Sequence, residues 1–390
     1  LQSVFVFQIL REDNMKKILR FPLVWIFFLF LFGYMIFDIS QYNKTFSELE
    51  NRELAQRPTF TLSSFYNNKF SPKYESYIND QFVLRDQWIS LKSRSESLLG
   101  KIENNGIMYG NDGYMFQHYT TADMDRIETN TKFVNEFVQL YPDLNITMGI
   151  IPNSYMVYPE KVPVGAGQVD QTALTQKIYK SLDSSVQTLN FLEPLRSNKE
   201  QYIFYRTDHH WTTLGAYYGY SSFCEYKGWQ PVLLDSLIET EVADFYGTYF
   251  SKTKAYNAVP DIITYYNIPV TQVSIDGKEA NGLYDLEKFQ QRDKYAAFLW
   301  ENHGITVIKS DNNLRKEEGK TSRILLIKDS YGNSFAPFLT YQYDEVYVVD
   351  LRSIPVKMSE FLAENKFDDV LILYNFMNFS SDTNLAKLRY

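Results

Sequence analysis

The chain has 390 residues, enough for one large domain or two ordinary ones, and 45% of them are hydrophobic, which is ample for a packed core. The formal net charge of −8 argues against a nucleic-acid partner, because no long basic stripe offers to neutralise phosphates. The single cysteine, Cys224, excludes an internal disulfide and a metal site built from several cysteines.

An apolar segment near the beginning of the chain predicts a membrane span. Residues 21–37 read FPLVWIFFLFLFGYMIF and carry no charge, and Ile39 extends the run. This length is close to the minimum of about 17 residues for a transmembrane helix. No small-x-small cleavage motif follows the run, so we favour an uncleaved signal anchor over a removed signal peptide or a buried core helix.

The charges on either side of this segment predict its orientation. Asp38 follows it, and basic residues precede it. The basic residues are Lys16, Lys17 and Arg20. This bias puts the N-terminus in the cytoplasm and the body of the protein outside the cell. Met15 is a natural start, so we interpret residues 1–14 as an upstream extension and residues 15–40 as the cytoplasmic start and transmembrane anchor.

Residues 41–105 are polar with the pattern of short helices, and we interpret them as a stem between the membrane and the main domain. Aromatic residues recur there at helical spacing, with a break or a fresh start at Pro72. They are Phe65, Phe70, Tyr74, Tyr77 and Phe82. Residues 85–99 continue as an amphipathic helix that ends at Gly100.

The main domain covers residues 106–390 and opens with a tight turn. Gly110-Asn111-Asp112-Gly113 predicts a turn between two short strands, because these residue types adopt positive φ at low cost. Strands and helices then alternate along the chain. The predicted buried strands are residues 145–151, 188–192, 324–328, 345–350 and 369–374. The predicted helices are residues 125–141, 170–187 and 213–227, and a further helix begins at Tyr331.

Apolar strands that alternate with helices are typical of an α/β fold in which helices cover both faces of a parallel sheet. Residues 233–323 fit this alternation less well. We interpret them as an insertion over one edge of the sheet, with the character of a lid. Within the insertion, residues 260–275 predict β structure and residues 286–295 predict a helix.

The most informative motif is Asp208-His209-His210-Trp211. The chain has only four histidines, and two of them are adjacent here, beside a carboxylate. On an extended segment, side chains at i and i+2 point the same way, so Asp208 and His210 are expected on one face. The carboxylate then holds one imidazole nitrogen while the other faces a nucleophile, as in a catalytic triad.

The same extended geometry predicts that His209 points away from Asp208 and His210 and that Trp211 lies in the core. A metal site at Asp208, His209 and His210 is the alternative, and it is disfavoured because adjacent histidines on a strand diverge. His118 and His303 have no carboxylate at useful spacing, and we interpret them as structural.

Lys328-Asp329-Ser330-Tyr331 supplies the candidate nucleophile. A buried strand stops at Asp329, and Ser330 stands where a helix begins, so its hydroxyl is accessible and nearby backbone N–H groups can hold an oxyanion. Sites form at the carboxyl ends of strands in open α/β sheets. The alternative is that Ser330 merely caps the helix.

The Asp208-His209-His210-Trp211 run resembles the signature of the DHHW family, and the order of the motifs resembles that of the alginate O-acetylation proteins X and J. The resemblance rests on Asp208-His209-His210-Trp211 followed by Asp329-Ser330, and less specifically on Glu50-Asn51-Arg52 and the Gly110 turn. It implies an SGNH-hydrolase-like fold with a circularly permuted order of blocks, so that the serine follows the histidine. It also implies Ser330 as nucleophile, His210 as base and Asp208 as the residue that orients the base.

The chain departs from the wider SGNH pattern in two ways. Lys328 stands where glycine usually precedes Asp-Ser, and one residue rather than two separates Asp208 from His210. The resemblance further implies an asparagine that holds the oxyanion. By order along the chain, Asn375 is the first candidate and Asn378 the second. Arg352, just beyond a predicted strand, is a candidate contact for an anionic or acyl oxygen.

The function expected from the resemblance is O-acetylation of an extracellular polysaccharide, with the acetyl group supplied by a multi-spanning membrane acyltransferase. No phosphate-cradling glycine loop is present, and no cofactor is expected. Two alternatives stay open at this stage. One is a carbohydrate acetylesterase with the same triad, and the other is a non-catalytic polysaccharide-binding scaffold, which the high aromatic content of 17% would equally serve.

Overall fold

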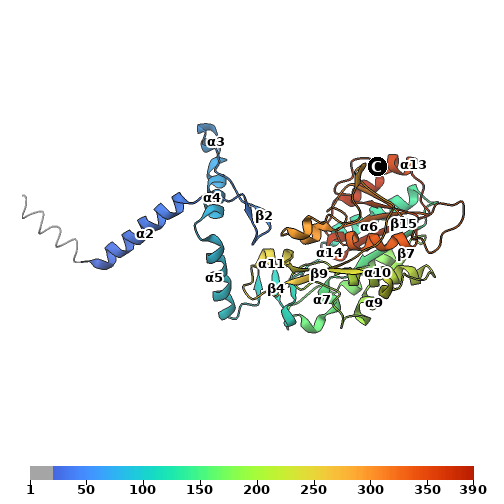
Figure 1. Cartoon of the computed structure of the whole chain (residues 1–390), viewed down its shortest axis with the longest axis horizontal. Helices are drawn as coiled ribbons and strands as arrows, with labels where there is room; N and C mark the ends of the chain where they lie inside the picture. Colours follow the sequence, from blue (N-terminus) through green and yellow to red (C-terminus); the bar gives the residue numbers. More distant parts are fainter. Residues whose placement is uncertain (1–20) are drawn as a thin grey trace, which may run out of the picture. The chain divides into compact units, whose positions relative to one another are not determined.

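The computed structural model describes residues 21–390, and its elements are labelled in Figure 1. The chain divides into two compact units, one ending at Lys92 and the other covering Ser93–Tyr390. The expected upstream extension over residues 1–14, the start at Met15 and the basic residues before the apolar segment lie outside the described residues.

Helix α2 (Pro22–Ser40) covers the predicted membrane-spanning segment except Phe21, which is its N-cap residue. None of its side chains is buried, and within the described residues it is the one helix long and apolar enough to cross a membrane, with a mean hydropathy of 2.1. Near its end, Tyr34 accepts a hydrogen bond from Trp88 Nε1, and Asp38 accepts one from Val83 N–H at 2.8 Å. A helix of this kind is shared by signal anchors and signal peptides.

Residues 41–98 contain short helices, as predicted, and polar contacts connect the elements of this segment. Its elements are β1 (Phe46–Ser47), β2 (Arg52–Glu53), α3 (Leu62–Tyr66), α4 (Phe70–Gln81) and α5 (Arg85–Leu98). Arg52 donates two hydrogen bonds to Asp80, at 2.9 and 2.6 Å, and Arg85 donates to Glu50 at 2.5 Å. No side chain of α3 or α4 is buried, so the predicted aromatic stripe lies on the surface of this unit.

The second unit is built on an eight-stranded sheet with the order β11-β10-β12-β14-β13-β15-β6-β7. The strands from β14 to β7 are parallel neighbours. They are β6 (Ile146–Ile151), β7 (Gln187–Asn190), β13 (Arg323–Lys328), β14 (Glu345–Val349) and β15 (Asp369–Asn375). Each coincides within a few residues with a predicted buried strand, so this half of the sheet is confirmed.

Helices cover both faces of this sheet, because side chains alternate along each strand. In β13, Ile324 and Leu326 belong to one core cluster, whereas Leu325 and Ile327 belong to another. The first cluster includes side chains of α9 (Leu192–Ser197) and α10 (Thr213–Tyr226). The second includes those of α6 (Met124–Leu140), α8 (Gln171–Ser181) and α13 (Met358–Glu364). The expected layering is confirmed (Figure 1).

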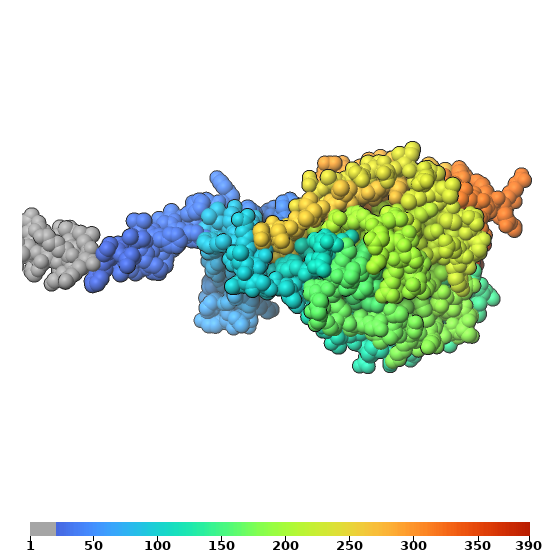
Figure 2. Space-filling view, turned by 90° about the horizontal axis from the view of Figure 1, so that it is seen from below, coloured from blue at the N-terminus to red at the C-terminus, as the bar shows by residue number. Residues whose placement is uncertain are grey.

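The predicted insertion extends the sheet, which is therefore mixed rather than purely parallel. Its strands β10 (Gln272–Ile275), β11 (Lys278–Ala280) and β12 (Ile305–Lys309) pair antiparallel, and β12 joins β14. Its strands β8 (Glu239–Phe245) and β9 (Asp261–Tyr266) form a separate ribbon. In Figure 2 this yellow segment lies beside the yellow-green helix α10, to which it is joined by a hydrogen bond of 2.5 Å from Thr213 Oγ1 to Thr264 O.

The prediction of a helix over residues 286–295 is wrong. The structure has two short 3-10 helices there, η4 (Lys288–Gln290) and η5 (Lys294–Ala297). The carboxylate of Asp285 accepts the Glu287 N–H at 3.1 Å, and this local bond competes with the hydrogen bonds of an α-helix.

The remaining elements are short. The small sheet consists of β3 (Glu103–Asn104), β4 (Ile107–Tyr109) and β5 (Met115–Gln117). The turn between β4 and β5 contains Asp112 at φ 57° and Gly113 at φ 76°, which confirms the predicted turn. The short α-helices are α7 (Ser154–Val157), α11 (Thr248–Thr253), α12 (Gly332–Phe335) and α14 (Phe376–Phe379). The other 3-10 helices are η1 (Asn111–Gly113), η2 (Pro159–Lys161), η3 (Leu234–Ser236), η6 (Ala336–Tyr341) and η7 (Asn384–Arg389).

Candidate functional site

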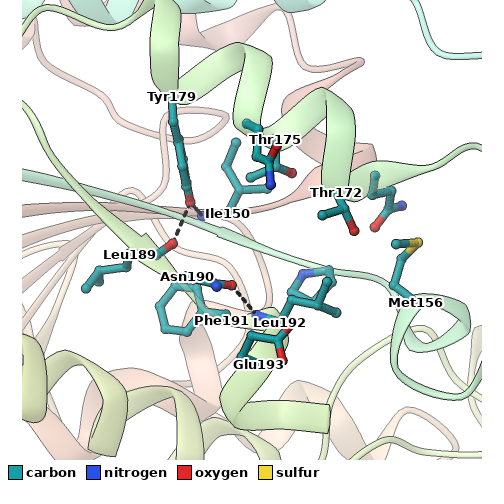
Figure 3. Close-up of a pocket in the computed structure, with 13 residues that line it drawn as sticks. Ile150, Met156, Thr172, Thr175, Tyr179, Leu189, Asn190, Phe191, Leu192 and Glu193 are labelled. Carbon is teal, nitrogen blue, oxygen red and sulfur yellow. Dashed lines mark hydrogen bonds between the residues drawn. The ribbon is translucent and has the colours of Figure 1, made fainter.

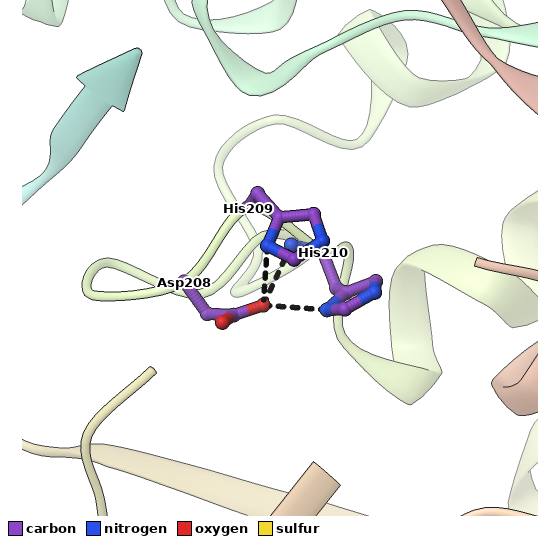
Figure 4. Close-up of side chains that lie close together, drawn as sticks. All are labelled: Asp208, His209 and His210. Carbon is purple, nitrogen blue, oxygen red and sulfur yellow. Dashed lines mark hydrogen bonds and ion pairs between the residues drawn. The ribbon is translucent and has the colours of Figure 1, made fainter. Parts of the chain in front are cut away.

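The Asp208-His209-His210-Trp211 motif lies on a bent loop, so the expectation of an extended segment is wrong. Phe204 and Trp211 form an isolated antiparallel bridge, and the chain between them doubles back. Asp208 and His210 meet because Asp208 Oδ1 accepts the His210 N–H at 2.9 Å, which closes a tight side-chain turn. The same oxygen lies 2.6 Å from His210 Nδ1 (Figure 4).

Ser330 lies far from Asp208 and His210 in the sequence but next to them in the structure. Strand β13 ends at Lys328, and the chain turns through Ser330 before α12 begins. Ser330 Oγ is 2.7 Å from His210 Nε2, across 120 residues of sequence. Tyr331 is the N-cap of α12 and no side chain caps this helix, so the capping alternative for Ser330 is wrong. The structure thus brings Asp208, His210 and Ser330 together.

The Asp208 carboxylate is buried and ionised. Burial alone would raise its pKa, but the neighbouring imidazoles of His209 and His210 and hydrogen bonds from His210 and Thr248 outweigh burial and hold the pKa well below the usual range. Thr248 contributes both its N–H, at 2.7 Å, and its hydroxyl, at 3.0 Å, to Asp208 Oδ2. The carboxylate is therefore fixed in the geometry that directs Nδ1–H of His210 towards it.

Gly247 allows this close approach. A Cβ atom on Gly247 would lie 2.2 Å from the Asp208 Cβ and 2.4 Å from its Oδ2. Distances under 3.0 Å are not seen for real Cβ atoms, so no side chain fits here without displacing the carboxylate. The glycine therefore lets the α11 N–H of Thr248 reach Asp208.

Asp261 fixes the loop that carries Asp208 and His210 through hydrogen bonds. This buried carboxylate accepts hydrogen bonds from the Arg206 N–H, from the Thr207 N–H and hydroxyl, and from the Tyr202 hydroxyl. Thr207 in turn accepts the Gly247 N–H at 3.0 Å. Burial raises the pKa of Asp261 despite these donors. The loop that presents His210 is thus tied to β9 of the insertion.

Aromatic side chains wall the site on two sides. The ring of Tyr295 stacks on His210 with centroids 3.8 Å apart and an interplanar angle of 9°, and its hydroxyl donates to Ser330 O at 3.1 Å. Trp211 is fully buried, as predicted, and its Nε1–H donates to Tyr331 O at 3.1 Å and to Ser334 Oγ at 3.0 Å. These contacts hold His210 and the Ser330 turn in register.

The two asparagine candidates lie around Asp329. Asn378 Nδ2 donates to Asp329 Oδ2 at 2.7 Å, and the same oxygen accepts the Asn375 N–H at 2.7 Å. The Asn375 side chain donates to Ile151 O at 3.1 Å and accepts the Met377 N–H at 3.1 Å. Asn375 therefore caps α14, and the structure gives neither asparagine a contact with Ser330. Burial raises the pKa of Asp329 against these donors.

Arg352 is bound to a buried ion pair. It donates to both oxygens of Asp350, at 2.9 and 2.5 Å, and its side chain is 41% exposed. Lys328 Nζ lies 3.2 Å from the same carboxylate, and Lys328 is only 2% exposed. Burial lowers the pKa of Lys328 to about 8, with Asp350 opposing the shift. The lysine that replaces the usual glycine before Asp-Ser thus anchors β13 to β14.

An unusual backbone segment packs behind the nucleophile. Leu299, Trp300 and Glu301 have φ of 50°, 61° and 82°, three consecutive residues in the left-handed region. Glu301 O accepts a hydrogen bond from Asn333 Nδ2 at 3.3 Å. The next residue, Asn302, accepts from Lys328 Nζ at 3.0 Å and from Asn333 Nδ2 at 3.2 Å. Such strain persists only where the surroundings enforce it.

His209 lies beside His210, contrary to the prediction that it points away. The two ring centroids are 3.8 Å apart, because the loop is bent rather than extended. Asp208, His209 and His210 each place one ligand atom within 4.8 Å of the others, a group that fits a metal ion by distance. In the structure, however, both Nδ1 atoms and both carboxylate oxygens make hydrogen bonds within the site. This donor set favours a hydrogen-bonded triad.

The other two histidines have carboxylate partners that are distant in the sequence. His118 Nδ1 lies 2.7 Å from Glu103, and His303 Nδ1 lies 2.9 Å from Asp276. Neither pair was visible from spacing, because Glu103 lies 15 residues from His118 and Asp276 lies 27 residues from His303. Both histidines also contact backbone carbonyls, which agrees with a structural role.

A pocket of about 190 Å³ lies at the carboxyl ends of β6 and β7 (Figure 3). Tyr179 spans it by donating to Leu189 O at 2.7 Å and accepting the Ile150 N–H at 2.8 Å. Phe191 lines the pocket and packs edge-on against Trp211, with centroids 6.3 Å apart. None of the residues that line this pocket belongs to the predicted site, so the pocket is separate from the candidate site.

Four residues that build the site were missed from the sequence: Gly247, Thr248, Asp261 and Tyr295. All lie in the segment interpreted as an insertion, which has no catalytic motif. The run Phe245-Tyr246-Gly247-Thr248-Tyr249 carries the one usable signal, since a glycine among aromatic residues indicates a close approach of backbone to another group.

Comparisons with known proteins support the family. Residues 157–349 match the family described as DHHW protein. The probable alginate O-acetylase AlgJ of Pseudomonas syringae pv. tomato is 22% identical over 180 residues, which are 42% of this chain and 44% of that protein. The match thus covers less than half of the length of this relative.

Two solved structures share the fold. A DHHW family protein from Eubacterium siraeum is 24% identical, with a TM-score of 0.63 over 74% of this chain and 96% of that chain. Bacillus cereus PatB1, solved with a sulfonyl adduct, is 18% identical, with a TM-score of 0.60 over 73% of this chain and 100% of that chain. The stretch that matches the DHHW family, residues 157–349, contains both the Asp208–Trp211 motif and Ser330.

Proposed function

We propose that this protein is a membrane-anchored O-acetyltransferase that moves an acetyl group onto an extracellular polysaccharide through Ser330, His210 and Asp208. The observation that carries the proposal is the continuous relay from Asp208 Oδ1 to His210 Nδ1 at 2.6 Å and from His210 Nε2 to Ser330 Oγ at 2.7 Å. The distant similarity of the chain to a probable alginate O-acetylase supports both the acyl chemistry and the sugar acceptor.

The first half-reaction forms an acetyl-enzyme. His210 Nε2 takes the hydroxyl proton of Ser330, whose oxygen attacks the acetyl carbonyl. The tetrahedral intermediate collapses, the bond to the donor's leaving group breaks, and that group takes the proton from His210. Asp208 stabilises the imidazolium that exists between these steps.

The oxyanion needs donors that are fixed before the reaction. Within residues 21–390, the Ser330 N–H has no hydrogen-bond acceptor, and we propose that it faces the oxyanion. Asn375 and Asn378 stay candidates for a second donor. Each side-chain amide nitrogen carries two hydrogens, and each amide donates to one protein acceptor in the structure.

In the second half-reaction, a sugar hydroxyl gives its proton to His210 and its oxygen attacks the acetyl carbon. The ester bond to Ser330 breaks, and Ser330 recovers the proton. We propose that α2 anchors the protein so that this chemistry takes place outside the cell. A multi-spanning membrane acyltransferase would supply the acetyl group there, because cytoplasmic acetyl donors do not reach that compartment.

The test is to trap the acetyl-enzyme. Full-length protein in detergent is incubated with an activated acetyl ester, with and without candidate glycans, and mass spectrometry locates acetyl groups. We expect an acetyl adduct on Ser330 that passes to sugar. Free acetate without sugar modification would indicate an esterase instead. A sulfonyl fluoride provides a second label, and failure of both reagents to modify Ser330 would show that the protein is not a serine-dependent acyltransferase.

A further inference from the structure

The imidazole rings of His209 and His210 lie side by side in the proposed site. Both turn their Nδ1 atoms towards Asp208, as Figure 4 shows. His210 Nδ1 lies 2.6 Å and His209 Nδ1 lies 3.5 Å from Asp208 Oδ1. The two Nε2 atoms therefore lie on the sides of the rings that face away from the carboxylate. One of them contacts Ser330, and the other belongs to His209, a residue to which the triad gives no role.

The proton on His209 can be assigned by counting hydrogens. Thr248 Oγ1 lies 3.0 Å from Asp208 Oδ2 and 2.7 Å from His209 Nδ1. The ionised carboxylate has no hydrogen to give, so the single hydroxyl hydrogen of Thr248 lies on the contact with Asp208. The contact with His209 then needs a hydrogen from Nδ1. A neutral His209 with Nδ1–H has a lone pair on Nε2, which makes that atom an acceptor.

His209 is also the member of the cluster that reaches solvent. Its side chain is 28% exposed, whereas those of Asp208 and His210 are 2% and 6% exposed. Partial burial of the ring and the adjacent His210 lower the pKa of His209, so the ring is neutral at physiological pH. Within the described residues, no protein donor contacts its Nε2. The site thus presents two adjacent imidazole acceptors, one used by Ser330 and one open.

We propose that His209 Nε2 binds a hydroxyl group of the acceptor, next to the hydroxyl that His210 deprotonates. This inference rests on the proposed function and deepens it. The ring centroids are only 3.8 Å apart, so the two acceptor nitrogens suit oxygens on neighbouring carbons of one sugar ring. The substrate class is therefore a polyol with vicinal hydroxyl groups, and an isolated hydroxyl fills only half of the site.

The experiment measures how the acetyl-enzyme divides between two acceptors. Full-length protein in detergent is acetylated with an activated acetyl ester in the presence of equal concentrations of cyclohexane-1,2-diol and cyclohexanol. The ratio of the two acetylated products is independent of how fast the acetyl-enzyme forms. One hydrogen bond predicts that the wild type favours the diol by about three- to tenfold beyond the statistical factor for its second hydroxyl.

Two substitutions separate binding from a structural role. In His209→Asn, the amide can still donate to Thr248, but nothing reaches the Nε2 position, and the product ratio should fall to the statistical value. In His209→Gln, the longer side chain can put an amide oxygen near the Nε2 position and should restore part of the preference. His118→Asn, at a histidine with a carboxylate partner outside the site, serves as the matched control and should keep the wild-type ratio.

Each outcome bears on the inference. A wild-type ratio in His209→Asn would overturn it, since the ring would then contribute only to packing. The same ratio in His209→Asn and His209→Gln, both below wild type, would also overturn it, because loss of loop structure explains that result. If wild-type protein forms no acetyl-enzyme on Ser330, the proposed function fails and the inference fails with it.

Discussion

Asp208 receives hydrogen bonds from the N–H and Nδ1 of His210 and from the N–H and hydroxyl of Thr248. A buried carboxylate with so many donors cannot rotate or take up a proton easily. It fixes the tautomer of His210 that leaves Nε2 as the acceptor for the Ser330 hydroxyl. At the scale of single residues, the proposed chemistry therefore depends on how Asp208 is held as much as on the nucleophile.

Replacement of Ser330 or His210 by alanine should abolish acetyl transfer. Loss of the general base alone should reduce the rate by about 10²–10⁴-fold. Ser330→Ala removes only a hydroxyl, so its thermal midpoint should change little, whereas His210→Ala also removes a hydrogen bond to the buried Asp208 and should lower the midpoint. Activity is measured as acetyl transfer to glycan and folding by differential scanning calorimetry. Wild-type turnover in either variant would contradict the assignment, and a collapsed midpoint would show that the variant reports on folding.

Lys328 should make the free energy of unfolding rise with pH. Its pKa is lowered from 10.5 to about 8 in the folded state. Between these values the unfolded chain holds more protons than the folded chain, so stability increases as the pH rises, by at most about 1.4 kcal/mol per pH unit. Lys328→Met should flatten the rise between about pH 8 and 10.5, measured by denaturant unfolding.

The control for this prediction is Lys309→Met, at a lysine whose side chain is 46% exposed. It should keep the wild-type slope. Equal slopes in wild type and Lys328→Met would mean that the buried Lys328–Asp350 pair does not titrate in this range. Arg352 remains bonded to Asp350 in the variant, so the carboxylate is not left without a partner.

Among the elements, the segment from η5 to β12 supports the site from the side opposite the Asp208 loop. Tyr295 stacks on His210, and four residues later the backbone enters its left-handed stretch. Glu301 O and Asn302 then bind Asn333, one turn beyond the nucleophile. Strain at this point is compensated by contacts with the element that carries Ser330.

Glu301→Gly should be more stable than Glu301→Ala. Glu301 has φ 82°, where any Cβ atom is unfavourable. Both substitutions remove the surface ion pair with Lys288, so their difference isolates the backbone term. We expect the glycine variant to exceed the alanine variant by about 0.5–1 kcal/mol in the free energy of unfolding, after the entropy of glycine is included. Equal stabilities would show that the turn is unstrained.

The parallel strands and the two motifs were predictable because their signals are local. Residues 324–328 are a continuous apolar run, and Asp208, His210 and Ser330 are types that suit a triad. Thr248 and Tyr295 could not be predicted, since their roles depend on contacts with Asp208 and His210, which lie far from them in the sequence. The geometry of the Asp208 loop was predicted wrongly for a related reason: the side-chain turn at His210 replaces the extended conformation.

At the scale of the whole molecule, the chain divides into two compact units, and the one apolar helix found in residues 21–390 lies in the first of them. The proposed anchoring predicts that the full chain stays in the membrane fraction after alkaline carbonate extraction, whereas a variant that begins at residue 41 is released. N-terminal sequencing of the membrane-bound protein should find α2 retained, and protease added to intact cells should digest the protein. Release of the full chain by carbonate, or a mature N-terminus beyond Ser40, would contradict anchoring.

The place of β15 in the sheet has a consequence for biosynthesis. This strand is the latest in sequence, yet it lies between β13 and β6. A growing polypeptide therefore cannot join the half of the sheet that carries Ser330 to the half built on β6 until residues 369–375 have been translated. Chains released early by the ribosome would expose two unpaired inner edges, which makes them candidates for degradation and not for residual enzyme activity.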